Sequence, residues 1–252
     1  MEASGPQPRV VPQPRADSAP SSRAVPWAIL AAAVLAVFGR TLGFPFLDWD
    51  DPTAVTENPL LHPPSLETLG RIWSAPWSGL YVPVSFTAWW IEMRVSLLLD
   101  AARAPDPRVF HAGLLLLHFL SACVVLRILR RLVDDPKAAL APWLGALLFA
   151  VHPLQTESVA WITETRGVLA GFLGFAALDL HLGAMSADDG SPGRRHVLSG
   201  IVFVLAVLAK PTAVAIPLLA FLIDRFRFRR PLARILPPVA IGCAIVLADV
   251  LA

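Results

Sequence analysis

Apolar segments that approach the width of a membrane recur along most of this chain, and they dictate what it can fold into. A helix needs ~20 apolar residues to cross the ~30 Å hydrocarbon layer of a bilayer. The chain is 56% hydrophobic and 16% charged, with a mean hydropathy of +0.61, so it is far more apolar than a soluble domain. The sequence therefore predicts an all-α protein built as a polytopic transmembrane helix bundle.

Clusters of basic residues predict how the chain crosses the membrane, because cytoplasmic loops are enriched in Lys and Arg. Following them gives about seven spans with a cytoplasmic N-terminus, and the first span is an uncleaved signal-anchor helix rather than a cleaved signal peptide. The predicted spans are residues 26–44, 109–126, 139–151, 168–182, 197–209, 212–223 and 235–252. Nearly every basic cluster then lies on one side of the membrane, so we expect no nucleic-acid partner.

Residues 1–25 differ in character from the rest of the chain. They are rich in Pro and Ser, show no apolar period and carry Arg9, Arg15 and Arg23. A segment of this composition cannot bury enough apolar surface to fold, and its basic residues favour the cytoplasm. We predict a disordered cytoplasmic tail over residues 1–25 and a transmembrane domain over residues 26–252.

Two segments allow alternative readings. Residues 81–99 are apolar but contain Glu92 and Arg94, which are costly at mid-bilayer, so we predict a helix along the outer leaflet within an extracytoplasmic first loop. A full span there would reverse the orientation of everything that follows. Residues 197–223 are predicted to form a hairpin that turns at Lys210. The alternative is one long helix broken at the following proline, which would move the next basic cluster outside.

An acidic cluster, Asp48-Trp49-Asp50-Asp51, follows directly after the first apolar segment. Carboxylates this close at a membrane boundary repel one another and are costly to desolvate. Such a cluster binds a cation, positions a proton acceptor or stays hydrated in a loop. Its three Asp residues offer hard oxygen ligands, yet the position at which an EF-hand needs its bidentate Glu is Pro59. A divalent metal stays an open alternative, and no cofactor is predicted.

Polar residues of three predicted loops fall on the outer side of the membrane, where they can converge on one cleft. They are Asp48, Asp50, Asp51 and Glu57 in the first loop, His152, Gln155, Glu157, Glu164 and Arg166 in the second, and Lys210 in the third. A carboxylate there can take a proton from a hydroxyl, and Arg or Lys can hold a phosphate. Tryptophans able to stack on a sugar are Trp49, Trp73, Trp77 and Trp161. Plain structural roles, such as a snorkelling Lys210 or a helix-ending His152-Pro153, are equally open.

Three motifs, in this order, resemble the signatures of a known enzyme family. They are residues 46–52 (FLDWDDP) with 55–59 (VTENP), residues 152–161 (HPLQTESVAW) and residues 208–211 (LAKP). The set resembles GT-C-type membrane glycosyltransferases, in particular bacterial relatives of the transmembrane and tetratricopeptide repeat-containing protein O-mannosyltransferases, over about residues 27–230. The resemblance implies an enzyme of the cytoplasmic (inner) membrane that moves a sugar from a polyprenyl-phosphate donor to an extracytoplasmic acceptor, which is a protein, glycan or lipid.

The resemblance also implies roles for individual residues. Asp50 and Asp51 occupy the catalytic acidic position, and one of them acts as general base toward the acceptor hydroxyl. Direct attack of that hydroxyl on the anomeric carbon implies inversion of configuration. The residues implied to bind substrate are His152, Glu157, Arg166 and Lys210, the last two beside the lipid phosphate.

Two features depart from the family pattern. Gly167 stands where the family has an acidic residue before the Val-Leu of the second signature, and the sequence ends at Ala252 inside an apolar segment. The family continues through more spans and commonly into tetratricopeptide repeats, and the sequence shows no 34-residue repeat. We therefore expect residues 26–252 to be an incomplete GT-C-like domain. The alternative functions are an inactive membrane scaffold and, less favoured, a secondary transporter.

Overall fold

The computed structural model describes residues 21–102, 105–133, 135–185 and 192–228. Most of the predicted tail, residues 1–20, and the last predicted span, residues 235–252, lie outside this range. The first helix begins at Ser21 and therefore starts within the segment that the sequence predicts as a tail.

The described residues form helices and no β-strand, which confirms the all-α prediction for this part of the chain. The helices are α1 (Ser21–Phe38), α2 (Leu66–Ser74), α3 (Pro83–Leu99), α4 (Pro107–Leu132), α5 (Ala141–Val151), α6 (Gln155–Ala160), α7 (Thr165–Met185), α8 (Pro192–Ala209) and α9 (Ala215–Leu222). Short 3₁₀ or π turns occupy Gly39–Gly43, Pro52–Thr56, Pro136–Ala138, Ile162–Glu164, Pro211–Val214 and Ile223–Arg227.

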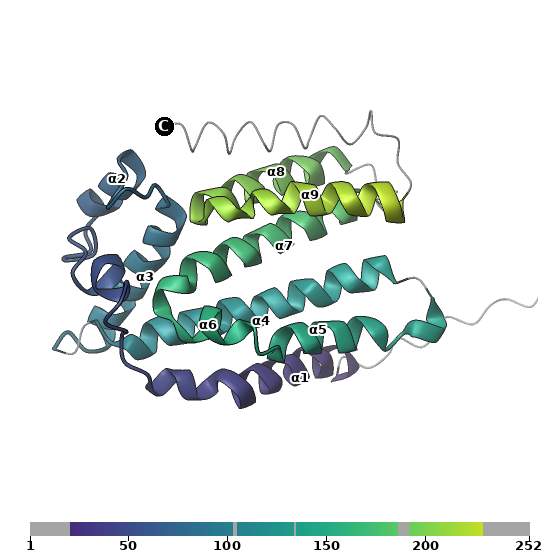
Figure 1. The fold of residues 1–252 in the computed structure, drawn as a ribbon, viewed down its shortest axis with the longest axis horizontal. Coiled ribbons are helices and arrows are strands. Elements are labelled where there is room, and N and C mark those ends of the chain that lie inside the picture. The colour runs from purple at the N-terminus through teal and green to yellow at the C-terminus, as the bar shows by residue number, and fades with distance from the viewer. Residues whose placement is uncertain (1–20, 103–104, 134, 186–191, 229–252) are drawn as a thin grey trace, which may run out of the picture.

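Signals in the sequence explain the ends of α4. Pro107 occupies its first turn, where a missing backbone N–H costs nothing. Asp106 caps the helix by accepting a hydrogen bond from the backbone N–H of Arg108 at 3.0 Å. Arg130 and Arg131 lie in the last turn, where cations interact favourably with the helix dipole. These signals fix both ends of a helix that runs through the middle of the bundle (Figure 1).

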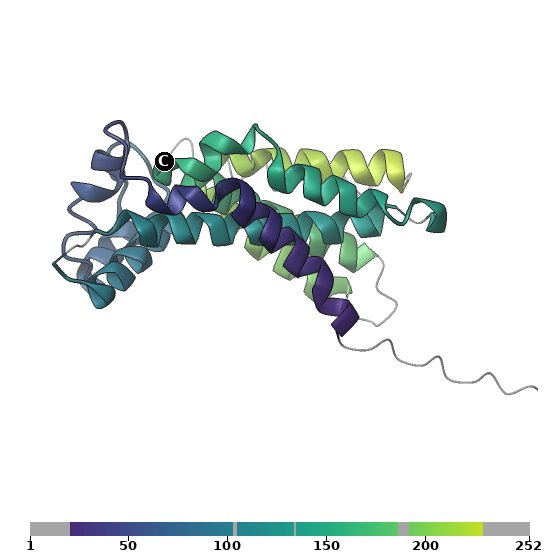
Figure 2. The same ribbon diagram turned by 90° about the horizontal axis from the view of Figure 1, so that it is seen from below.

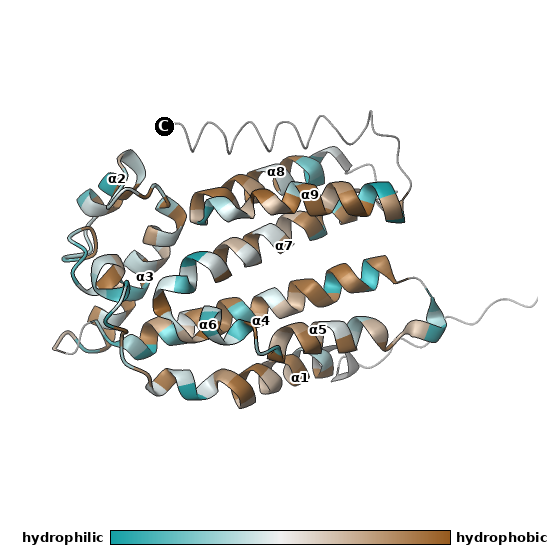
Figure 3. Cartoon of the chain, viewed as in Figure 1, coloured by the Kyte–Doolittle hydropathy of each residue, from teal (hydrophilic) through white to brown (hydrophobic). Residues whose placement is uncertain are grey.

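Among the described residues, three helical segments are long and apolar enough to cross a membrane, namely Val25–Gly43, Pro107–Leu132 and Ile162–Met185. A further apolar segment, Pro136–Val151, is shorter. Figure 3 shows hydrophobic residues along most of the bundle helices and hydrophilic residues gathered toward its ends. The protein is thus a helical membrane protein, while the count of about seven spans and the cytoplasmic N-terminus stay predictions.

The centre of the bundle is formed by α4 and α7, with α1 and α5 packed on α4 and with α8 packed along α7 (Figures 1 and 2). Arg127 and Arg131 of α4 each contact a carboxylate oxygen of Asp179 on α7 at 2.7 Å. Asp179 is buried, and a carboxylate paired with two guanidinium groups avoids the cost of an isolated buried charge. This ion-pair cluster joins the two central helices at the end far from α2 and α3.

The chain reverses direction at Lys210, as the hairpin prediction requires. Figure 1 shows α8 running toward the end that holds α3, and α9 running back from it. The segment after the reversal contacts α7 in the parallel sense, with Ile216 against Gly174 and Asp224 against His181. One long broken helix is therefore wrong for these residues. That both arms of the hairpin cross the membrane remains a prediction.

The predicted first loop contains α2 and α3, which lie together at one end of the bundle (Figures 1 and 2). α3 packs on α4 and α8, and the hydroxyl of Ser85 donates to the carbonyl oxygen of Ala209 at 2.8 Å. α3 is not among the segments long and apolar enough to span a membrane. This placement is compatible with the predicted interfacial helix, whose depth in a leaflet stays a prediction.

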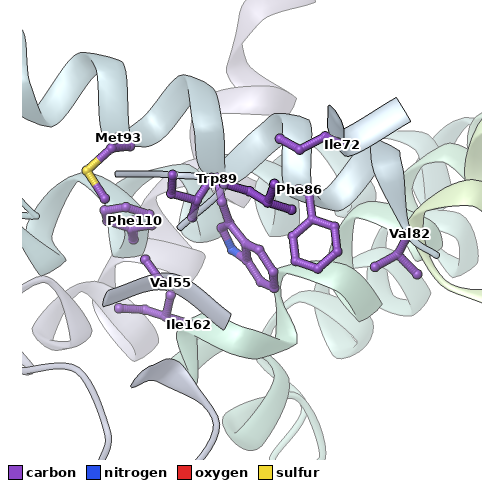
Figure 4. Packing of buried hydrophobic residues seen from close by; sticks show 10 residues of the cluster. Val55, Ile72, Val82, Phe86, Trp89, Met93, Phe110 and Ile162 are labelled. Atoms are coloured by element: carbon purple, nitrogen blue, oxygen red, sulfur yellow. The ribbon is translucent and has the colours of Figure 1, made fainter. Parts of the chain in front are cut away.

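A buried hydrophobic cluster holds the first loop on the bundle (Figure 4). It joins Val55 of the loop, Phe86 and Trp89 of α3, Phe110 of α4 and Ile162 just before α7. Burying one large apolar side chain contributes about 1.5–3 kcal/mol. The first loop is therefore a docked part of the fold, and its polar residues are held against the start of α7.

Candidate active site

A pocket of about 290 Å³ lies where the first loop, α3 and the start of α7 meet. Its lining residues are Asp50, Thr53, Ala54, Trp77, Ser78, Leu80, Phe86, Trp89, Thr163 and Arg166. The lining combines one carboxylate, one guanidinium group and three hydroxyls with aromatic and aliphatic walls. A pocket with few polar groups on an apolar wall is the usual form of a small-molecule site.

Asp51 does not line this pocket, because its side chain is fully buried and serves as an anchor. One carboxylate oxygen accepts a hydrogen bond from the backbone N–H of Leu47 at 2.8 Å. The other accepts from the backbone N–H of Thr163 at 3.0 Å and from the Thr163 hydroxyl at 2.5 Å. Three donors satisfy the buried charge and tie the first loop to the turn that precedes α7.

Asp50, the adjacent residue, is exposed and lines the pocket. The first turn after it is held by a hydrogen bond from the backbone N–H of Ala54 to the Asp50 carbonyl oxygen at 2.8 Å. The structure thus separates two carboxylates that the sequence could not distinguish. Asp51 is fixed by protein donors, and Asp50 is the carboxylate that a ligand in the pocket can reach.

Arg166, in the first turn of α7, supplies the positive charge of the pocket. Its Nε donates to the carbonyl oxygen of Thr163 at 3.3 Å, which orients the guanidinium group. Within the described ranges no salt bridge joins Arg166 to Asp50 or to another carboxylate. The pocket therefore offers an acceptor and a cationic donor that do not neutralise each other directly.

Lys210 lies outside the pocket lining and is paired with Glu164. Its Nζ contacts the two carboxylate oxygens at 3.1 and 3.0 Å. Gly167 belongs to the same arrangement, because a Cβ at this position would meet Oε2 of Glu164 at 2.6 Å and Nζ of Lys210 at 3.4 Å. The space beside Gly167 is thus filled by the carboxylate of Glu164, one helical turn earlier.

His152 and Glu157 are not brought into the pocket. Nδ1 of His152 accepts a hydrogen bond from the backbone N–H of Leu154 at 3.2 Å, directly after the end of α5. Glu157 is exposed on α6. Of the six predicted site residues, Asp50 and Arg166 share the pocket, and the proposed substrate contacts of His152, Glu157 and Lys210 stay predictions.

Sequence reasoning missed Thr163 and Trp89 as pocket residues. Thr163 meets Asp51 across 112 positions of the chain, and no local pattern marks that contact. Trp89 belongs to an apolar helix, where a tryptophan is typical of a membrane interface. Only the packing of α3 against the start of α7 brings both residues to the pocket.

In the described part of the chain, no group of three or more His, Cys, Asp or Glu side chains is arranged to hold a metal ion. Asp51, one of the three carboxylates offered by the sequence, is already occupied by Leu47 and Thr163. The residues present thus do not fit the three-carboxylate ligand set considered from the sequence.

Comparison with known proteins finds similarity to one group of curated proteins. Protein O-mannosyl-transferase TMTC3 of Mus musculus is 26% identical over 198 residues, which is 75% of this chain and 20% of that protein. Protein O-mannosyl-transferase TMTC1 of Mus musculus is 28% identical over 218 residues, covering 81% of this chain and 22% of that protein. Protein O-mannosyl-transferase Tmtc2 of Drosophila melanogaster is 29% identical over 140 residues, covering 54% of this chain and 14% of that protein.

The chain spans about a fifth of the length of the first two of these relatives. No protein-family model matches the sequence, and no solved structure matches it significantly. The named relatives are eukaryotic, so the predicted bacterial inner membrane is not shown by them. The similarity agrees with the one inferred from the three motifs. The chain is a distant relative of the TMTC protein O-mannosyl-transferases, which are membrane glycosyltransferases of the GT-C type.

Proposed function

We propose that this chain carries the donor-binding and catalytic pocket of a membrane glycosyltransferase that transfers a sugar from a polyprenyl-phosphate donor to an extracytoplasmic hydroxyl. The observation that supports it most is the presence of Asp50 and Arg166 in one pocket at one end of the bundle. The names of the relatives make mannose the first sugar to test.

In this proposal Asp50 is the general base. Its carboxylate takes the proton of the acceptor hydroxyl while the hydroxyl oxygen forms a bond to the anomeric carbon of the sugar. The bond from that carbon to the phosphate oxygen breaks, and the polyprenyl phosphate leaves with the electron pair. A single displacement of this kind inverts the anomeric configuration and needs no covalent glycosyl-enzyme.

Arg166 is proposed to stabilise the leaving phosphate. A guanidinium group presents a fork of N–H donors that matches phosphate oxygens, and it acts where negative charge develops during the reaction. Arg166 lies in the first turn of α7, and the hydrogen bond from its Nε to the Thr163 carbonyl oxygen orients its guanidinium group. The nearby Glu164–Lys210 pair fixes the end of α8 against the residues that precede this turn.

Asp51 and Thr163 have a positioning role in the proposal. By tying the first loop to the turn before α7, they hold Asp50 and Arg166 on the same pocket. His152 and Glu157 are proposed to contact substrate outside the pocket. The acceptor is a protein, a glycan or a lipid, and the membrane is the cytoplasmic membrane of a bacterium.

The proposal is tested by incubating the full-length protein, reconstituted in lipid, with polyprenyl-phosphate mannose and a panel of peptide, glycan and lipid acceptors. We expect transfer of mannose with inversion at the anomeric carbon, as read from the product by NMR. Transfer from a nucleotide sugar alone, retention of configuration, or no transfer to any acceptor would each contradict the proposal.

A further inference from the structure

A polar cleft and an apolar groove adjoin each other where α1 and α4 pack together, and neither shares a residue with the candidate active site. The polar cleft, of about 360 Å³, is lined by residues 42–45, after α1, and by residues 106–108, at the start of α4. The apolar groove, of about 260 Å³, is lined only by Ala, Val, Leu and Phe residues within 31–42 and 112–119. Leu42 lines both, so the two form one continuous surface.

The two parts of this surface lie at different depths in a membrane. Of the segments long and apolar enough to cross it, one ends at Gly43 and another begins at Pro107, and both of these residues line the polar cleft. The polar cleft therefore lies at headgroup level, and the apolar groove lies beside it in the hydrocarbon. Leu35 and Leu116, on the two walls of the groove, are each 56% exposed, so the groove is open to lipid.

The polar cleft presents one carboxylate and one guanidinium group that do not pair with each other. One oxygen of Asp106, Oδ1, accepts the backbone N–H of Arg108 at 3.0 Å and so caps α4. Within the described ranges the other oxygen of Asp106 and the guanidinium group of Arg108 take part in no hydrogen bond or salt bridge. Arg108 is exposed and Asp106 is only half-buried, so a ligand in the cleft can reach both charges.

These charges select a ligand that carries an anion and a cation close together. A guanidinium group binds phosphate oxygens, and a carboxylate accepts N–H donors from an ammonium group. A phospholipid whose headgroup ends in a primary ammonium supplies both. An anionic headgroup would meet repulsion from Asp106, and a trimethylammonium group has no N–H to donate. Because lipid tails are as apolar as the groove, the groove fixes the position of a chain and the polar cleft selects the headgroup.

We propose that this surface is a binding site for phosphatidylethanolamine. Its phosphate lies on Arg108, its ammonium group lies on the free oxygen of Asp106, and one acyl chain follows the apolar groove between α1 and α4. The site takes a lipid of the surrounding membrane and is separate from the pocket proposed for the sugar donor. It does not depend on the proposed function.

The test titrates the full-length protein, purified in detergent and stripped of lipid, with three phospholipids of identical acyl chains. These are phosphatidylethanolamine, phosphatidylglycerol and phosphatidylcholine, and native mass spectrometry measures Kd for the first lipid bound. We expect Kd for phosphatidylethanolamine to be about three- to tenfold lower than Kd for either of the other two, the size of one hydrogen bond. Equal Kd values for the three lipids would overturn the proposal.

Two charge variants then assign the headgroup contacts. Asp106→Asn removes the charge and keeps the helix cap, because Asn caps as well as Asp, and it should abolish the preference for phosphatidylethanolamine over phosphatidylglycerol. Arg108→Gln should raise Kd for all three lipids. Asp48→Asn and Arg71→Gln are the matched controls, since both residues are exposed and neither lines the cleft, and they should change no Kd. A preference that survives in Asp106→Asn would contradict the ammonium contact.

A steric variant tests the place of the acyl chain. Ala112 is exposed and lines the apolar groove, so Ala112→Phe should fill the groove and raise Kd for all three lipids. Ala32→Phe is the control, because Ala32 is an exposed alanine of α1 outside the groove lining. The same Kd values in the two variants would show that no chain occupies the groove and would overturn the proposal. If Ala112→Phe folds poorly, the Asp106→Asn result decides.

Discussion

Asp51 and Thr163 are 112 positions apart in the chain, yet the carboxylate of the first accepts two hydrogen bonds from the second. This contact joins the acidic cluster of the first loop to the turn that starts α7. It explains why two neighbouring carboxylates have different surroundings. The buried carboxylate of Asp51 anchors the first loop, and the exposed carboxylate of Asp50 lines the pocket.

Thr163→Val removes the hydroxyl that donates to Asp51 and keeps the shape of the side chain. Hydrogen bonds to charged groups contribute about 1.5–3 kcal/mol, so we expect a loss of stability of this size. Thr165→Val is a matched control, because the Thr165 hydroxyl donates to the neutral carbonyl of Ile162 and should cost only about 0.5–1.5 kcal/mol. Denaturation of both variants in detergent measures the difference, and an equal cost would argue against a special role of Asp51.

Gly167→Ala places a methyl group 2.6 Å from Oε2 of Glu164 and 3.4 Å from Nζ of Lys210. The carboxylate must move and its pairing with Lys210 is disturbed, and this cost offsets the gain of about 0.8–1 kcal/mol that alanine brings to a helix, so we expect no net stabilisation. Gly171→Ala on the same helix is the control, because nothing lies within 4 Å of its Cβ position. Alanine is the better helix former by about 0.8–1 kcal/mol, so that variant should be slightly stabilised.

A double-mutant cycle extends this prediction. Glu164→Ala removes the atom that occupies the space beside Gly167. Gly167→Ala should then be slightly stabilising in the Glu164→Ala background, as Gly171→Ala is in the wild-type protein, because the contact that it disturbs is gone. Additive changes in the melting temperature, with the same effect of Gly167→Ala in both backgrounds, would show that Glu164 is not what restricts residue 167.

Much of this fold can be predicted from the sequence, because apolar length and proline or cap positions are local signals. The predicted apolar segment 109–126 lies within α4, and the predicted reversal at Lys210 is present. The site is different. The Glu164–Lys210 pair and the burial of Asp51 depend on how α7, α8 and the first loop pack together, and no residue pattern encodes them. Gly167 departs from the family motif in the sequence, and only the structure shows Glu164 filling its place.

The buried carboxyl group of Glu92 in α3 is expected to make the stability of the fold depend on pH. Its carboxylate lies against Gly113 of α4, and its Oε2 is buried without a partner among the described residues. Burial raises the pKa of Glu92 well above its ordinary value of 4.5. The folded state therefore binds this proton more tightly than the unfolded state, which adds stability below about pH 4.5 that is lost as the pH rises through the raised pKa.

Glu92→Gln keeps the shape of the side chain and removes the ionisation. We expect the variant to melt higher than the wild-type protein at neutral pH, and the gap should close as the pH is lowered toward 4.5. Melting temperatures of both proteins across this range measure the effect. A gap that does not change with pH would mean that the Glu92 carboxyl does not titrate within it.

The most direct test of the account compares Asp50→Asn with Asp48→Asn in the full-length protein at matched expression. Asp48 is an exposed carboxylate of the same cluster that does not line the pocket. The quantity measured is the rate of mannose transfer from polyprenyl-phosphate mannose. Loss of a general base lowers a rate about 10²–10⁴-fold, and we predict a loss in this range for Asp50→Asn and a near wild-type rate for Asp48→Asn. Wild-type transfer by the Asp50→Asn protein, or an equal loss in both variants, would contradict the account.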